Sequence, residues 1–170
     1  MVLVLGGARS GKSAYAERLI FDSGLDAVYV ATATPGDAEM AERIAEHRSR
    51  RGGSWRTIEA PDRLEDTLQR EAGEGRAVLV DCLTLWLTNI MLAGADTEAR
   101  ARSLAQTAGR LPGLRIFVSN EVGLGLVPET GLGRRFRDAQ GRLNQTMAEA
   151  ADRVVFMTAG LPLILKGQSS

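Results

Sequence analysis

A segment near the start of the chain has the residue types and spacing of a phosphate-binding loop. Gly6-Gly7-Ala8-Arg9-Ser10-Gly11-Lys12-Ser13 matches the pattern G-x-x-x-x-G-K-[ST] without a gap. Its glycines let backbone N–H groups turn toward phosphate oxygens, and the N-terminus of a following helix adds its dipole. A chance glycine turn is the alternative, but the segment stands between an apolar run and an Ala-rich stretch, which is the context the motif requires. We therefore predict that all these residues bind a nucleotide, with Lys12 on the β- and γ-phosphates and Ser13 on Mg²⁺.

A second candidate is a carboxylate at the end of an apolar run. Val78-Leu79-Val80 leads directly into Asp81. Such a run places an acid at the tip of a strand, where it can hold Mg²⁺ directly or through water. An ordinary strand-end aspartate is the alternative, and the neighbouring phosphate loop favours the metal role. We predict that Asp81 and Ser13 share a Mg²⁺ ion.

The chain's single histidine, His47, lies in a stripe of residues at helical spacing. Met40, Ile44, His47 and Arg51 are four, three and four positions apart, so they would share one face of a helix. A basic helix end can simply complement the helix dipole, which is worth about 0.3–1 kcal/mol per charge. Arginines can also cradle a polyphosphate while a neutral imidazole acts as a nucleophile. Spacing alone leaves both readings open, and further arginines cluster nearby at Arg43, Arg48 and Arg50.

The elements that must position these residues follow from short aliphatic runs alternating with stretches rich in Ala, Leu, Glu and Arg. The runs are aliphatic on consecutive positions, which is typical of strands covered on both faces, and the stretches between them predict helices. We expect strands at Val2–Leu5, Val28–Ala31, Val78–Val80, Ile116–Val118 and Val154–Met157, with a weaker one at Leu163–Leu165. We expect helices at Ser13–Ile20, Ala38–Arg51, Arg63–Glu74, Thr84–Leu92, Thr97–Leu111 and Leu132–Ala151. The alternation predicts one α/β domain over residues 1–170, with a mainly parallel sheet flanked by helices.

In such folds ligands collect at the carboxyl ends of the strands. For the Ser119-Asn120-Glu121 cluster two interpretations stay open: contact with the γ-phosphate or the second substrate, or capping of Gly123–Gly125. Cys82 beside Asp81 is expected to be a small buried filler, and Trp86 a core residue. The places to which the strand-end rule points are Gly6–Ser13, Thr32–Thr34, Asp81-Cys82, Ser119-Asn120-Glu121 and Thr158–Gly160.

Composition excludes several classes of protein. The 170 residues are 44% hydrophobic and 25% charged with a formal net charge of zero, so no basic surplus points to nucleic-acid binding. One cysteine and one histidine exclude an internal disulfide framework and a Cys- or His-rich metal site. The apolar runs are too short to span a bilayer, and Met1–Gly6 has no basic region typical of a signal peptide. We expect a cytoplasmic protein.

The ordered motifs resemble the bifunctional adenosylcobinamide kinase / adenosylcobinamide-phosphate guanylyltransferase family of cobalamin biosynthesis, over nearly the whole chain. This resemblance is far more specific than the phosphate loop alone. Besides that loop, it rests on Glu39-Met40…Arg43-Ile44…His47-Arg48, Trp55-Arg56-Thr57-Ile58-Glu59, Val80-Asp81-Cys82-Leu83-Thr84, Ser119-Asn120-Glu121-Val122-Gly123, Val127-Pro128, Gly133-Arg134…Phe136-Arg137-Asp138, Asn144-Gln145 and Ala159-Gly160-Leu161-Pro162.

The resemblance implies two reactions on a corrinoid. A nucleoside triphosphate, ATP or GTP, phosphorylates the aminopropanol hydroxyl of adenosylcobinamide, and GTP then donates GMP to that phosphate with release of pyrophosphate. In the family the GMP passes through a covalent histidine intermediate, and His47 is the matching position. The resemblance thus implies His47 and Lys12 as catalytic residues. Two rival functions remain: a simple small-molecule kinase in which His47 only binds phosphate, and a nucleotide-gated switch without turnover.

The same resemblance implies further nucleotide contacts. Glu59 would accept hydrogen bonds from the guanine edge, with a solvated loop acid as its alternative. Gly52-Gly53 stands where the family pattern leads us to expect a proline. A recombinase-like phosphate-loop fold and a homotrimer are also implied. The positions matched as nucleotide contacts, besides the phosphate loop, are Ala31, Thr32, Ala33, Arg48, Ser49, Arg50, Arg51, Glu59 and Asp81.

Overall fold

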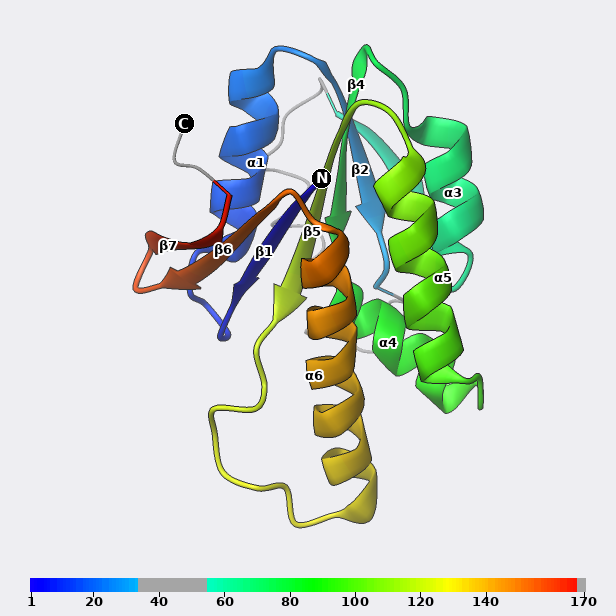
Figure 1. Ribbon diagram of the computed structural model, residues 1–170, viewed down its shortest axis with the longest axis vertical. Helices are drawn as coiled ribbons and strands as arrows, with labels where there is room; N and C mark the ends of the chain where they lie inside the picture. Colours follow the sequence, from blue (N-terminus) through cyan, green and yellow to red (C-terminus); the bar gives the residue numbers. More distant parts are fainter. Residues whose placement is uncertain (34–54, 168–170) are drawn as a thin grey trace.

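A seven-stranded sheet forms the centre of the computed structural model, which describes residues 1–33 and 55–167 (Figure 1). The strand order is β3-β2-β4-β5-β1-β6-β7, and every neighbouring pair is parallel except β6 and β7. The predicted α/β class with a mainly parallel sheet is confirmed. The strands are β1 (Val2–Gly6), β2 (Asp26–Ala31), β3 (Arg56–Glu59), β4 (Arg76–Asp81), β5 (Leu114–Asn120), β6 (Arg153–Thr158) and β7 (Leu161–Lys166).

Helices cover the two faces of the sheet unequally. Within the described ranges α1 packs on one face, where Ala16 and Ile20 meet Val4, Leu79 and other strand residues. The remaining helices bury the larger cluster on the other face. Trp86 is fully buried in that cluster, as predicted. The helices are α1 (Lys12–Ser23), α3 (Leu64–Glu71), α4 (Leu83–Leu92), α5 (Thr97–Arg110) and α6 (Gly131–Ala150).

The edge strand β3 has no counterpart among the predicted strands. Three of its four residues are exposed, so it lacks the aliphatic run that marks the central strands. It is held at its start by Arg56, which forms an ion pair with Glu71 at the end of α3. Glu71 is only 3% exposed and also pairs with Arg70 and Arg76. The buried carboxylate of Glu71, paired with three arginines, therefore holds β3 in place, although β3 has no aliphatic run by which the sequence could reveal it.

Two further expectations shift in detail. The weak strand at the C-terminus is real, but β7 runs antiparallel to β6 as an exposed sheet edge. Helix α6 begins at Gly131, one residue before the expected start at Leu132, because the Thr130 side chain accepts a hydrogen bond from the Gly133 N–H and caps the helix. The predicted helix Ala38–Arg51 lies outside the described residues, as does the Gly52-Gly53 pair that stands where a proline is expected.

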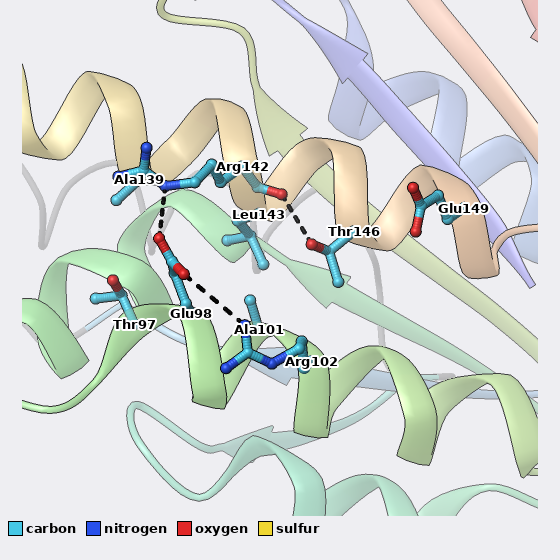
Figure 2. A pocket seen from close by; sticks show the side chains of 9 residues that line it. All are labelled: Thr97, Glu98, Ala101, Arg102, Ala139, Arg142, Leu143, Thr146 and Glu149. Atoms are coloured by element: carbon cyan, nitrogen blue, oxygen red, sulfur yellow. Dashed lines mark hydrogen bonds and ion pairs between the residues drawn. The ribbon is translucent and has the colours of Figure 1, made fainter.

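Helices α5 and α6 lie side by side, with a shallow pocket between them (Figure 2). Its lining includes two glutamates, Glu98 and Glu149, and two arginines, Arg102 and Arg142, so the formal charges of the lining balance. Glu98 Oε1 lies 3.0 Å from Arg142 Nε, and Glu98 Oε2 lies 3.8 Å from Arg102 Nη1. The Glu98–Arg142 pair joins α5 to α6, and the Glu98–Arg102 pair lies within α5, so one carboxylate engages both arginines of the pocket. None of the helices described is both long and apolar enough to cross a membrane.

Candidate nucleotide and magnesium site

The predicted phosphate loop joins the end of β1 to the start of α1. Gly6 and Gly11 have φ angles of +152° and +95°, which favour glycine. A Cβ at Gly6 would collide with the Met157 carbonyl oxygen and with Ser10 Oγ. One at Gly11 would come within 3.2 Å of Gly160 Cα. The loop backbone is therefore packed so closely against the end of β6 that these two positions require glycine.

The N-terminus of α1 offers free backbone donors. Gly11 is the N-cap residue and no side chain caps the helix. The first intrahelical bond runs from the Tyr15 N–H to the Gly11 carbonyl, at 3.0 Å. The preceding N–H groups, those of Lys12 and Ser13 among them, remain for an anion, and the helix dipole favours one. The arrangement matches what the sequence motif predicts for phosphate binding.

Lys12 is a buried cation in this loop. It is 7% exposed, and its Nζ donates to the Gly7 carbonyl at 2.5 Å. Burial lowers the pKa of Lys12, and the charges of Cys82 and Asp81 oppose that shift. In the described part of the chain no carboxylate lies within ion-pair distance of the ammonium. A polyphosphate would supply the missing negative charge and raise this pKa.

Asp81 ends β4 on the same face of the sheet as α1. Side chains alternate along a strand, and Leu79, two residues earlier, packs in the core cluster on the α1 face. The Asp81 Oδ2 atom is buried and accepts no hydrogen bond from any described residue, although the charge of Asp81 acts on Lys12. This carboxylate oxygen and the Ser13 hydroxyl are both suitable donors for Mg²⁺, which binds one or two carboxylates together with substrate phosphates. No group of three or more His, Cys, Asp or Glu residues capable of holding a metal occurs in the described ranges.

The hydroxyl of Thr32 has a structural role that the sequence did not indicate. Its hydroxyl donates to the Cys82 carbonyl at 2.7 Å and accepts from the Cys82 N–H at 2.9 Å. Its own carbonyl accepts from Asn89 Nδ2 at 2.9 Å. The side chain is fully buried, so it ties the end of β2 to the end of β4. The predicted contact between Thr32 and a nucleotide stays a prediction, and it would have to avoid this hydroxyl.

The other residues expected near the nucleotide fall at the same edge of the sheet. Ala31 and Ala33 flank Thr32 and are half-buried. Glu59 ends β3 opposite Ala31 in the register, with an exposed side chain. Their contacts with a nucleotide stay predictions. The remaining candidates, His47, Arg48, Ser49, Arg50 and Arg51, lie outside the described residues.

Cys82 behaves as the predicted buried filler. It is 8% exposed, and burial together with the charge of Asp81 raises the pKa of its thiol to about 11. The neutral thiol is therefore the form present at physiological pH, and a thiolate nucleophile is not available there.

Residues that follow two strands, β5 and β6, support the phosphate loop. In the sequence, the rule that ligands collect at the carboxyl ends of strands pointed to both places. The Gly160 N–H donates to the Ser10 carbonyl at 3.0 Å, and the Glu121 N–H donates to the Gly6 carbonyl at 3.0 Å. The Glu121 carboxylate accepts from the Gly123 N–H at 2.5 Å, which confirms the capping interpretation for this one residue. The sequence motif predicts the phosphate loop, and the bonds from the Gly160 and Glu121 N–H groups hold that loop in place.

Comparison with known proteins assigns this arrangement to a family. Residues 2–165 match the model of the family described as cobinamide kinase / cobinamide phosphate guanyltransferase. The chain belongs to this family. It is 54% identical over 168 residues to the bifunctional adenosylcobalamin biosynthesis protein CobP of Pseudomonas aeruginosa, covering 98% of this chain and 97% of that protein. It is 39% identical over 181 residues to the CobU protein of Escherichia coli K12, covering 98% and 99% of the two chains. As a family member it is a bifunctional kinase and guanylyltransferase.

Solved structures resemble the chain in fold alone. A protein from Pyrococcus horikoshii OT3 superposes with a TM-score of 0.59 at 11% identity, over 99% of this chain and 87% of that one. The RadB recombinase gives a TM-score of 0.47 at 16% identity, over 91% and 72% of the two chains. The family assignment rests on the sequence matches and not on these likenesses.

Proposed function

We propose that this enzyme phosphorylates the aminopropanol hydroxyl of adenosylcobinamide and then transfers GMP from GTP to the new phosphate, giving adenosylcobinamide-GDP. The observation that carries the proposal is the buried, carboxylate-free ammonium of Lys12 inside a phosphate loop, in a chain that matches the bifunctional family over its length. A site with one buried positive charge and open helix N–H groups is suited to the triphosphate of ATP or GTP.

In the kinase step, the substrate hydroxyl oxygen attacks the γ-phosphorus and the bond to the β-phosphate oxygen breaks. Lys12 and the first-turn N–H groups of α1 stabilise the negative charge on the transferring and leaving phosphates. Ser13 and Asp81 would hold Mg²⁺, which when bound neutralises further charge on those phosphates. The hydroxyl proton leaves to solvent or to a base that we do not assign.

In the guanylyl step, the resemblance supports a two-stage transfer through His47. The neutral imidazole attacks the α-phosphorus of GTP, a P–N bond forms, and pyrophosphate leaves. An oxygen of the adenosylcobinamide phosphate then attacks the same phosphorus and frees the imidazole. Arg48, Ser49, Arg50 and Arg51 would bind the nucleotide phosphates in this stage, and Glu59 the guanine edge.

The remaining assignments follow from the same resemblance. Ala31, Thr32 and Ala33 are proposed to contact the nucleotide, through groups other than the engaged Thr32 hydroxyl. A homotrimer is proposed, and the exposed leucines of the edge strand β7 supply apolar surface for such an assembly. A cytoplasmic location is proposed as well, and the use of ATP and GTP as substrates supports it. Sedimentation of a fully active 18.2 kDa monomer would contradict the trimer.

Labelling with α-labelled GTP tests the histidine route directly. The denatured wild-type protein should retain label in an acid-labile, alkali-stable phosphoramidate. A His47→Ala variant should lose the label and the GMP transfer while it still phosphorylates adenosylcobinamide. A Lys12→Ala variant should lose both reactions. Wild-type protein that transfers GMP without taking up label would make the transfer direct, and a protein that binds nucleotide without any turnover would be a switch.

A further inference from the structure

Asn120 occupies the end of the strand that separates the phosphate loop from Asp81. β5 pairs with β1 on one side and with β4 on the other. In the register Asn120 lies opposite Gly6, and Val118 lies opposite Asp81. The residue therefore stands between the group that binds phosphates and the carboxylate suited to Mg²⁺.

The alternation of side chains along β5 places Asn120 on the face that α1 covers. Ile116 and Val118 pack in the core cluster that includes α1 residues, whereas Phe117 belongs to the cluster on the opposite face. Ser119 follows Phe117, and its hydroxyl meets Asn144 of α6. Asn120 follows Val118 by two residues, so its side chain lies on the same side of the sheet as Lys12 and Asp81.

The backbone around Asn120 is held by three different elements. Its N–H donates to Thr84 Oγ1 of α4 at 2.9 Å, and its carbonyl accepts from Asn144 Nδ2 of α6 at 3.1 Å. The next N–H, that of Glu121, donates to the Gly6 carbonyl of the phosphate loop at 3.0 Å. These bonds fix the position of the Asn120 Cα without using its side chain.

A buried polar network reinforces this clamp. Gln140 Nε2 donates to Ser119 Oγ and to Asn144 Oδ1, both at 3.0 Å, and Ser119 Oγ donates to Asn144 Oδ1 at 2.7 Å. Ser119 and Gln140 are fully buried and Asn144 is 6% exposed. Gln140 Oε1 has no hydrogen-bond partner in the structure. Burying amides with incomplete satisfaction costs stability, so this network sets the position of the β5 end at a cost that a purely apolar core would avoid.

The side-chain amide of Asn120 is the unused group in this arrangement. In the described part of the chain it makes no hydrogen bond, whereas Asn89 Nδ2 donates to two carbonyls and both amide atoms of Asn144 are engaged. An amide on a fixed backbone, half-buried and one strand from the phosphate loop, is preorganised to donate to a ligand.

We infer that Asn120 is a catalytic residue of the kinase step, donating a hydrogen bond from Nδ2 to an oxygen of the transferring γ-phosphoryl group. This inference rests on the proposed kinase reaction. The substrate hydroxyl oxygen forms the new P–O bond, the bond to the β-phosphate oxygen breaks, and Asn120 keeps all its protons throughout. Its donor stabilises the charge on the γ-phosphoryl oxygens as that group moves.

The test compares Asn120→Ala and Asn120→Asp with a matched control, Gln145→Ala, an exposed amide of α6. Both Asn120 variants keep the clamp, because the clamp uses only backbone atoms of residue 120. Kinase kcat should fall about 10²–10³-fold in Asn120→Ala, the loss typical of one transition-state donor, and at least as far in Asn120→Asp, where an anion faces the phosphoryl group. KM for the triphosphate should change much less than kcat. Affinity for the nucleoside diphosphate, which has no γ-phosphate, should stay at the wild-type value.

Calorimetric titration with a non-hydrolysable triphosphate and with the diphosphate gives a readout independent of turnover. The wild-type preference for triphosphate over diphosphate should shrink in Asn120→Ala and persist in Gln145→Ala. Wild-type kcat and an unchanged triphosphate preference in Asn120→Ala would overturn the inference. Equal loss of affinity for diphosphate and triphosphate would also overturn it, since the residue would then only shape the loop. If Lys12→Ala retains kinase activity, the proposed function itself fails, which is a distinct result.

Discussion

Replacing Lys12 by methionine should weaken nucleotide binding without lowering the stability of the nucleotide-free protein. Lys12 is 7% exposed, and no carboxylate in the described ranges pairs with its ammonium. Burial lowers its pKa, which means that the folded, nucleotide-free protein disfavours the charged form. Methionine keeps an apolar stem of similar length and removes the charge. The nucleotide-free Lys12→Met protein should therefore be at least as stable as the wild type.

Nucleotide binding should change in the opposite direction. The same ammonium offsets phosphate charge in a site that excludes most water, and such a contact contributes about 3–4 kcal/mol to transition-state stabilisation, or 10²–10³-fold in rate. Urea unfolding without nucleotide, calorimetric titration with the triphosphate and kinase kcat measure the three quantities. Arg18→Met, an exposed cation on the same helix, is the matched control and should leave all three unchanged. A Lys12→Met protein that unfolds more easily yet still binds triphosphate and turns over would refute this account.

The pH dependence of unfolding tests independently whether the charge of Lys12 destabilises the nucleotide-free protein. Between the lowered pKa of folded Lys12 and its ordinary value of 10.5, the unfolded chain holds a proton that the folded chain has released. The free energy of unfolding contributed by Lys12 therefore rises as pH increases through that window. Bound phosphate raises the folded pKa and should abolish the rise. The difference between wild type and Lys12→Met, measured with and without nucleotide, isolates this contribution.

Three further changes have definite expected outcomes. Asp81→Asn should raise the Mg²⁺ concentration for half-maximal kinase rate more than it weakens metal-free nucleotide binding; an unchanged Mg²⁺ dependence would make Asp81 a structural strand end. The thiol of Cys82 has its pKa raised from 9.0 to about 11, so the stability of the wild type relative to Cys82→Ala, measured by urea unfolding, should fall by roughly 2–3 kcal/mol as pH rises through that window. Ala159 has φ +52° beside Gly160 in the two-residue β6–β7 turn, where asparagine is favoured. Ala159→Asn should raise the unfolding free energy by up to about 1 kcal/mol, and lower stability would contradict the turn assignment.

Aliphatic runs located the central strands because a strand covered on both faces must be apolar at consecutive positions. The same rule could not find β3, since its residues are mostly exposed and its attachment depends on Arg56 and the buried Glu71 of another element. An ion pair between residues distant in sequence leaves no periodic pattern. The phosphate loop, by contrast, could be identified from the sequence because its glycines, its lysine and its serine lie within eight consecutive residues.

The role of Thr32 shows the limit of the strand-end rule. The rule places residues at the correct edge of the sheet, but it does not say which of them face a ligand. Thr32 uses its hydroxyl on the backbone of Cys82, whose position depends on how β4 pairs with β2. That pairing exists only in the folded chain. A polar residue at the end of a predicted strand therefore indicates where the side chain lies, but not which partner it binds.

In the cluster Ser119-Asn120-Glu121 the fold gives three neighbouring polar residues three different surroundings. In the sequence these three polar residues are equivalent candidates for phosphate contact or for capping. In the described part of the chain Ser119 bonds within the buried network with α6, Glu121 caps the Gly123 N–H, and the Asn120 amide, on the α1 face, makes no hydrogen bond. The alternation of a strand separates neighbours onto opposite faces, but only the placement of α1 decides which face meets the phosphates. The kinetic comparison of Asn120→Ala with Gln145→Ala thus tests a distinction that exists only in the folded chain.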